Sequence, residues 1–117
     1  MNNMLILPIK KKWFDMILSG EKKEEYRELS PFYKSRFKNI FDMYPYSHIP
    51  SGYDTKQIML RNGYSKTSPS CIIDVTLGIN QGKEEWGAEI GKEYYFLIIK
   101  KIIWKSYDNM GGYIGRT

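Results

Sequence analysis

A charged segment over residues 20–27 carries the residue types best suited to chemistry. Lys22 offers a compact positive charge for a phosphate, and Arg27 offers a planar, bidentate donor for a phosphate or a base edge. Glu25 could orient either cation, or accept a proton from a substrate or a water molecule. Gly20 precedes these residues and permits a sharp backbone turn. This segment is therefore the first candidate for a functional site.

A solvated surface is the ordinary alternative for such a mixed run of charges, because exposed ion pairs contribute little free energy. The spacing adds a constraint. In a regular strand Glu25 and Arg27 share one face, and Lys22 lies on the other. The three side chains converge only if Lys22 sits in the turn before the strand begins. The sequence thus leaves open whether one site contains all three.

Hydrophobic spacing and turn residues predict the elements that position this segment. Apolar residues spaced by four indicate a first helix that Gly20 should end, and Ser30-Pro31 is typical of the start of a second helix. Strict alternation of apolar and polar residues over 73–79 indicates the cleanest strand. The predicted strands or extended segments cover 4–9, 22–29, 57–60, 73–79 and 94–104, and the predicted helices cover 11–19 and 30–42.

Turns connect the later strands, among them Arg61-Asn62-Gly63, where Asn-Gly suits a positive φ. Direct turns favour antiparallel pairing and argue against a doubly wound sheet. The strand over 94–104 is apolar on both faces for most of its length, which predicts a central position. The predicted fold class is α+β, a small β-barrel with two flanking helices. It forms a single domain over 1–105, followed by a flexible C-terminal tail over 106–117.

The composition is that of one soluble domain with a basic surplus. The chain has 117 residues, 42% of them hydrophobic and 26% charged, and a formal net charge of +5. This charge favours an anionic partner such as RNA or a nucleotide. Cys71 is the only cysteine, which excludes an intramolecular disulfide and fits a reducing compartment. No stretch approaches the roughly 18 apolar residues of a membrane span, so we expect a cytoplasmic location and no membrane partner.

Other residues are candidates for ligand contacts, each with a structural alternative. Trp86 lies in a glycine-punctuated connection, either as a stacking platform for a base or as a loop anchor on the barrel. Arg61 could reach a phosphate or remain a solvated turn residue. His48 and the distant Cys71 cannot form a zinc site, so we expect no metal and no cofactor. Cys71 and Trp13 are expected to pack in the core.

Residues 20–27 match the pattern G-x-K-x-x-E-x-R, and this pattern resembles the signature of the ASCH family. Residues 61–65 and 82–87 are similar to segments of small bacterial and phage-borne members, in the same order. The resemblance covers about 5–103 of the chain. It implies a small PUA-like β-barrel with two flanking helices. It also implies a cleft beside the barrel that the signature residues line and that suits RNA.

Some small relatives in that family are amidohydrolases that remove an acetyl group from N4-acetylcytidine. They use a lysine, a threonine and a glutamate. The resemblance places that lysine at Lys22, but Glu25 stands where those relatives have the threonine. A carboxylate cannot serve as the same hydroxyl nucleophile.

Two functions follow from these residues. The first is an RNA- or nucleotide-binding domain, in which Lys22 and Arg27 contact phosphate or base edges and Glu25 holds them in place. Trp86 and Arg61 would add ligand contacts. The second is a small amidohydrolase acting on an acylated cytidine nucleoside, or an RNA hydrolase, with Lys22 as amine or acid and Glu25 as base. If the chain is such an enzyme, we expect the pKa of Lys22 to be lowered.

A third interpretation is a protein-interaction module, for instance a phage-encoded regulator of a host factor. It predicts a sizeable exposed apolar patch away from the signature. No feature of the sequence points to such a patch, and no obligate protein partner is expected.

Overall fold

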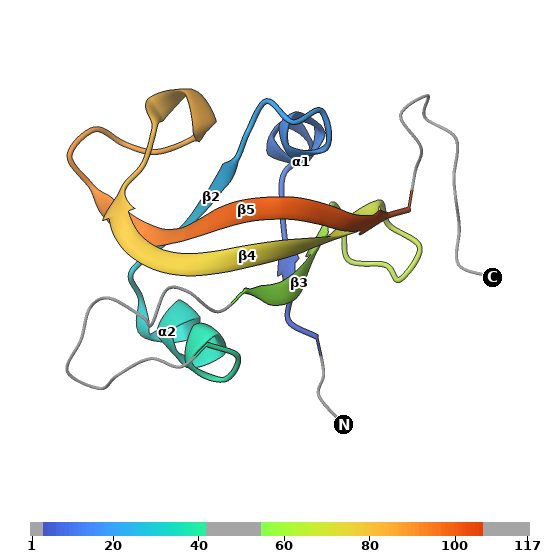
Figure 1. Ribbon diagram of the computed structural model, residues 1–117, viewed down its shortest axis with the longest axis horizontal. Coiled ribbons are helices and arrows are strands. Elements are labelled where there is room, and N and C mark those ends of the chain that lie inside the picture. The colour runs from blue at the N-terminus through green and yellow to red at the C-terminus, as the bar shows by residue number, and fades with distance from the viewer. Residues whose placement is uncertain (1–3, 42–54, 107–117) are drawn as a thin grey trace.

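The computed structural model of the chain describes residues 4–41 and 55–106, which form two α-helices and a curled five-stranded mixed sheet (Figure 1). The predicted order of elements is confirmed. His48 and the predicted tail, apart from Ser106, lie outside the described residues. In chain order the elements are β1 (Ile6–Pro8), α1 (Lys11–Leu18), β2 (Glu24–Arg27), α2 (Pro31–Lys38), β3 (Lys56–Arg61), β4 (Ser70–Gln81), the short 3₁₀ helix η1 (Glu84–Trp86) and β5 (Glu93–Lys105).

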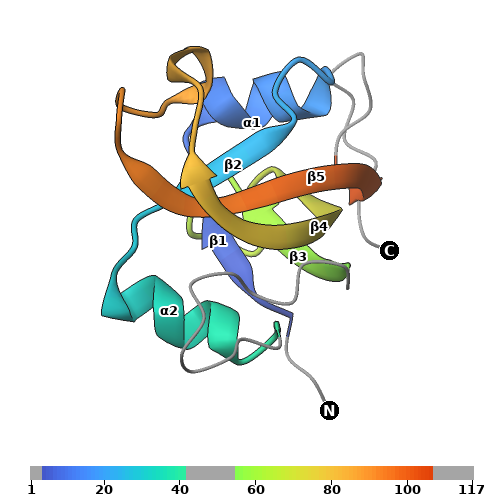
Figure 2. The same ribbon diagram turned by 60° about the vertical axis from the view of Figure 1, so that its left-hand side comes forward.

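The long strands β4 and β5 form the spine of the sheet, whose strand order is β1-β3-β4-β5-β2. Their pairing shifts register between Ile72 and Ile73 and again between Asp74 and Val75. Such irregularities bend a strand pair and increase its twist, and Figures 1 and 2 show the resulting curved ribbon. The sheet is therefore curled into a half-barrel. As predicted, β5 is an interior strand, although β4 occupies the middle.

Antiparallel pairing of the turn-connected strands is confirmed, and one further strand pair is parallel. The pairs β3–β4, β4–β5 and β2–β5 are antiparallel, but β1 pairs with β3 in parallel. The chain between β1 and β3 contains α1, β2 and α2. A parallel pair needs a long crossover of this kind, whereas a short turn can only join antiparallel strands. The prediction concerned only the turn-connected strands, so it did not include this pair.

The start of α2 agrees with the prediction, but its end does not. The hydroxyl of Ser30 accepts a hydrogen bond from the first turn at 3.3 Å, as expected of an N-cap. The helix ends at Lys38 and so is shorter than the predicted 30–42. A further turn follows, in which the amide of Phe41 donates to the carbonyl oxygen of Phe37 at 2.8 Å. Phe41 thereby reaches the core without a continuous helix.

The interior of the half-barrel is apolar, and the two helices cover it from opposite sides. Figures 1 and 2 both show α1 above and α2 below the β4–β5 ribbon. Phe14 and Ile17 of α1 and Phe37 of α2 are buried. Phe32 fits the helical spacing of a buried face but is 54% exposed, and its ring centroid lies 3.4 Å from the guanidinium carbon of Arg36. No helix in the described ranges is long and apolar enough to cross a membrane.

Cys71 lies fully buried on the core face of β4, as predicted. Burial raises the pKa of its thiol to about 12. A thiol that stays protonated and inaccessible is not a nucleophile, so Cys71 acts as a small apolar core residue.

Candidate functional site

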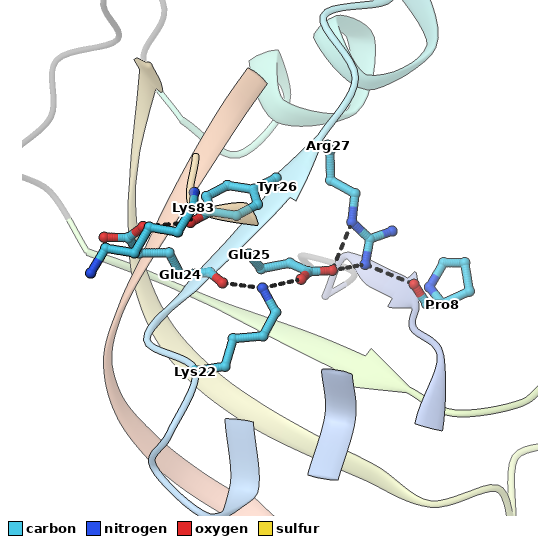
Figure 3. Close-up of polar contacts among 7 residues, drawn as sticks. All are labelled: Pro8, Lys22, Glu24, Glu25, Tyr26, Arg27 and Lys83. Carbon is cyan, nitrogen blue, oxygen red and sulfur yellow. Dashed lines mark hydrogen bonds and ion pairs between the residues drawn. The ribbon is translucent and has the colours of Figure 1, made fainter. Parts of the chain in front are cut away.

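The predicted site residues Lys22, Glu25 and Arg27 lie in contact with one another (Figure 3). Glu25 is held between the two cations. Its Oε1 lies 3.0 Å from Lys22 Nζ, and its Oε2 lies 2.7 Å from Arg27 Nη2. Arg27 Nε donates to the same Oε2 at 3.2 Å. One site therefore contains all three residues, which we call the buried cluster.

In a regular strand Lys22 would point away from Glu25 and Arg27, and the local backbone explains why it does not. Gly20 has a φ of 86° and ends α1, and the amide of Lys22 donates back to α1 at 2.9 Å. Lys22 thus sits in the turn before β2, where strand alternation does not apply. Glu25 and Arg27 then share the buried face of β2, opposite core residues of β5. This is the arrangement that the spacing required for convergence.

Burial excludes the solvated surface that was the ordinary alternative for this segment. Lys22 is 1% exposed, Glu25 is 5% exposed and Arg27 is 9% exposed. Taking charged groups out of water is costly, and buried ion pairs seldom stabilise a fold more than apolar residues of similar size would. The cluster is therefore not explained by stability alone.

Lys22 has both polar and aromatic neighbours. Its Nζ donates to the carbonyl oxygen of Glu24 and lies 4.8 Å from the ring centroid of Tyr26 and 5.6 Å from that of Trp13. Desolvation by burial lowers the pKa of Lys22 below its ordinary value, although the carboxylate of Glu25 opposes this effect. A lysine with a lowered pKa is better suited to proton transfer near neutral pH than an ordinary lysine.

Arg27 connects the two edges of the sheet. Its Nη2 donates to the carbonyl oxygen of Pro8 in β1 at 2.8 Å, and its Nη1 donates to the hydroxyl of Tyr33 in α2 at 3.3 Å. Strands β1 and β2 are the edge strands of the sheet. A side chain thus bridges the open side of the half-barrel, and Figure 3 shows Pro8 facing the guanidinium.

The connection between β4 and β5 covers the aromatic residues beside Lys22. The hydroxyl of Tyr26 donates to Glu24 Oε1 at 2.6 Å and accepts from the amide of Lys83 at 2.9 Å. Desolvation, followed by the bond to Glu24, raises the pKa of Tyr26 above its ordinary value. Gly82 lies so close to the Tyr26 ring that an added Cβ would be 2.6 Å from it. At Gly87 an added Cβ would be 3.1 Å from the indole of Trp13.

The remaining predicted ligand contacts, Trp86 and Arg61, do not join the buried cluster. Trp86 is half-buried in η1, and Lys83 Nζ lies 4.4 Å from its ring centroid. It belongs to the connection that covers Tyr26. Arg61 is the register partner of Pro8 in β3, and its Nη2 lies 3.6 Å from a methionine sulfur. Arg61 therefore lies near the cluster through Pro8, but its side chain forms no hydrogen bond or ion pair with Lys22, Glu25 or Arg27.

Sequence reasoning missed Tyr26, Trp13, Tyr33 and the carbonyl of Pro8 as neighbours of the cluster. Trp13 was expected in the core, and Tyr26 lies within the charged segment. No sequence pattern linked either residue to Lys22. Pro8 and Tyr33 meet Arg27 only through the tertiary fold.

The described residues contain no group of three or more histidine, cysteine, aspartate and glutamate side chains that could hold a metal ion. Comparison of the chain with protein-family models, with curated proteins and with solved structures gives no match. The resemblance to the ASCH family therefore stays a prediction.

Proposed function

We propose that this chain is an ASCH-like domain with a PUA-like barrel that binds RNA or a nucleotide beside the buried cluster. The observation that carries the proposal is that Glu25 holds Lys22 and Arg27 at 3.0 and 2.7 Å inside a chain of net charge +5. Pre-positioned donors lose little further entropy when a ligand binds. A role in ligand recognition accounts for three buried charges that stability alone does not explain.

The neighbours of the cluster fit a nucleotide. The longest contact of Arg27 is that of Nη1 with the Tyr33 hydroxyl at 3.3 Å, so this end of the guanidinium is the one a base edge or phosphate would engage. The half-buried rings of Trp13 and Tyr26 lie beside Lys22, and the parts of the rings that the β4–β5 connection leaves exposed can contact a base. Glu25 has the structural task of keeping both cations in place.

The experiment is a titration of a short fluorescent single-stranded RNA with the wild-type protein and Lys22→Met at stepped salt concentrations. Methionine keeps the apolar volume of the buried side chain and removes its charge. We expect salt-dependent binding by the wild type and about a tenfold loss in Lys22→Met. Lys34→Met, an exposed change on α2, is the matched control and should bind like the wild type. Equal binding by wild type and Lys22→Met would contradict a role for the cluster.

A second candidate function is favoured by the lowered pKa of Lys22. In an amidohydrolase acting on an N4-acylated cytidine, Glu25 would take a proton from the attacking water, and Lys22 would give one to the departing amine. The products would be the free acid and cytidine. Both oxygens of Glu25 are engaged by cations, so this function ranks second.

Mass spectrometry of the purified protein with a panel of N4-acylated cytidines tests the second candidate. Deacylation that Lys22→Ala abolishes would establish the enzyme. No turnover at high protein concentration would leave the binding function alone.

A further inference from the structure

Three segments that meet at one end of the sheet carry lysine and arginine but no aspartate or glutamate. They are residues 4–12, 61–70 and 99–106. In Figure 1 the loop between β3 and β4 lies beside the end of β5, with α1 above them. Each segment has charges of one sign only, although Lys11 pairs with Asp15 and Lys101 lies 4.0 Å from Asp74, both outside the segments. The other cations of these segments add positive charge at this end.

Hydrogen bonds join these segments. The amide of Ile9 donates to the carbonyl oxygen of Arg61 at 3.0 Å, and Nδ2 of Asn62 donates back to the carbonyl oxygen of Ile9 at 2.9 Å. The amide of Ser106 donates to the carbonyl oxygen of Ser70 at 2.9 Å. The basic residues that follow Ile9 in the chain are thereby fixed next to the loop that follows Arg61.

The β3–β4 loop over 62–69 presents an aromatic ring to solvent from a well-bonded backbone. Ser68 donates its amide to the carbonyl oxygen of Ser65 at 3.0 Å, and the amide of Ser65 donates to Ser68 Oγ at 3.1 Å. Gly63 has a φ of 134°, and an added Cβ would be 2.4 Å from Ser68 Oγ. In this compact loop Tyr64 is 95% exposed. A ring held in water at low entropic cost is suited to stacking on a planar partner.

Three cations at this end, Lys10, Arg61 and Lys66, have no carboxylate partner in the described part of the chain. Lys10 and Lys66 are exposed, and neither of them nor Arg61 forms an ion pair there. The side-chain acceptor of Arg61 is the sulfur of Met59 at 3.6 Å, and a thioether is a weak acceptor. Arg61 Nε is buried without a hydrogen-bond partner among these residues. Their charge is therefore available to an anion.

Two exposed lysines, Lys11 of the first segment and Lys92 outside the segments, are paired with carboxylates. Lys11 lies 2.6 Å from Asp15, and Lys92 lies 2.9 Å from Glu28. The opposite end of the β4–β5 ribbon carries the glutamates of η1.

We infer that Lys10, Arg61, Tyr64 and Lys66, which we call the basic end, bind a stretch of single-stranded RNA next to the buried cluster. The cations contact phosphates, and the ring of Tyr64 stacks on an unpaired base. A duplex does not fit, because its bases are already stacked on one another. The inference rests on the proposed function, in which the cluster holds one nucleotide of the same strand. Pro8, which accepts from Arg27, lies two residues before Lys10 and connects the two regions.

Fluorescence anisotropy with labelled single-stranded oligouridine and with a duplex of equal length tests this surface. The variants are Lys10→Ser/Lys66→Ser and Tyr64→Ser, all at exposed positions where substitution leaves the fold intact. Lys34→Ser/Lys38→Ser on α2 is the control, because it removes the same charge from the other side of the ribbon. The first double variant should weaken binding at least tenfold and reduce the slope of log K against log salt by about 1.4. Tyr64→Ser should weaken binding about fivefold or more.

Each contrary outcome has a distinct meaning. Equal losses in both double variants would show a general charge effect and overturn the inference. Duplex bound as tightly as single strand, with Tyr64→Ser unchanged, would overturn it as well. Wild-type affinity in the basic-end variants together with weak binding by Lys22→Met would overturn the inference alone. No RNA binding by the wild type would overturn both the inference and the proposed function.

Discussion

The charged residues of the buried cluster and those of the basic end differ in their burial and in their pairing with carboxylates. In the cluster, Lys22 and Arg27 are at most 9% exposed and share one carboxylate. At the basic end, Lys10 and Lys66 are exposed and form no ion pair with a described residue. The difference is a centrally placed acid, Glu25, in the first region and the lack of any acid in the segments of the second.

The two regions differ in how they can act on a ligand: the buried cluster holds groups in fixed positions, and the basic end attracts anions. Buried pairs are little screened by salt and hold groups in fixed positions, whereas exposed cations attract polyanions over a distance that salt shortens. The cluster therefore suits short-range recognition of one group, and the basic end suits capture of a strand. Changes in the cluster should therefore act on both stability and binding, and changes at the basic end on binding with little effect on stability.

The largest expected effect on stability is that of Glu25→Gln. This change leaves Lys22 and Arg27 buried without a carboxylate, and such uncompensated charge costs about 3–5 kcal/mol. Urea denaturation followed by circular dichroism measures the free energy of unfolding. The triple variant Lys22→Met/Glu25→Leu/Arg27→Met removes all three charges and should lose less than Glu25→Gln. A loss below about 1 kcal/mol in Glu25→Gln would mean that the cluster is solvated in solution.

A smaller loss is expected from Gly82→Ala. Its new Cβ would meet the Tyr26 ring at 2.6 Å, and overpacking of this kind costs about 1–3 kcal/mol. Gly78→Ala in β4 is the matched control, because an added Cβ there has nothing within 4 Å. Comparing the two unfolding free energies tests whether the β4–β5 connection really lies on the ring beside Lys22. Equal stabilities would contradict that contact.

The pH dependence of stability should reveal the lowered pKa of Lys22. Between the lowered folded value and the ordinary unfolded value, the unfolded chain binds more protons, so the free energy of unfolding rises with pH. The destabilising contribution is full below the folded pKa and disappears above the ordinary one.

We expect the unfolding free energy of the wild type, minus that of Lys22→Met, to increase from neutral pH towards alkaline pH. Measuring both proteins at each pH cancels the opposite effect of Tyr26 and Tyr95, whose raised pKa values lower stability at alkaline pH. A flat or falling difference would contradict the lowered pKa.

The smallest effect on stability is expected at the basic end. Lys10→Ser/Lys66→Ser removes exposed charges without partners in the described chain, so its unfolding free energy should stay within about 0.5 kcal/mol of the wild type. Thermal and urea unfolding of the double variant measure this. A loss as large as that of Glu25→Gln would remove the distinction between the two regions.

The features that could be predicted from the sequence are those that depend on residues close together in the chain. Alternation placed the strand that became β4, and Ser30-Pro31 and Gly20 placed two helix boundaries. The pattern of residues 20–27 singled out Lys22, Glu25 and Arg27, which the fold brings together.

What the sequence could not predict depends on contacts between distant segments. Arg27 meets Pro8 across the open side of the sheet, and Gly82 lies on Tyr26, because the curled ribbon brings those segments together. The parallel pairing of β1 had no local signal either. Phe32 fits the helical spacing of a buried face, yet the described core lies on the other side of α2.

Photo-crosslinking of the wild-type protein to single-stranded RNA that carries 4-thiouridine tests the account most directly. Mass spectrometry of the crosslinked peptides shows which residues touch the bases. We expect crosslinks at Tyr64 in the basic end and at Trp13 or Tyr26 beside Lys22. Crosslinks confined to Phe32 and Tyr33 on α2, or spread evenly over the surface, would contradict it.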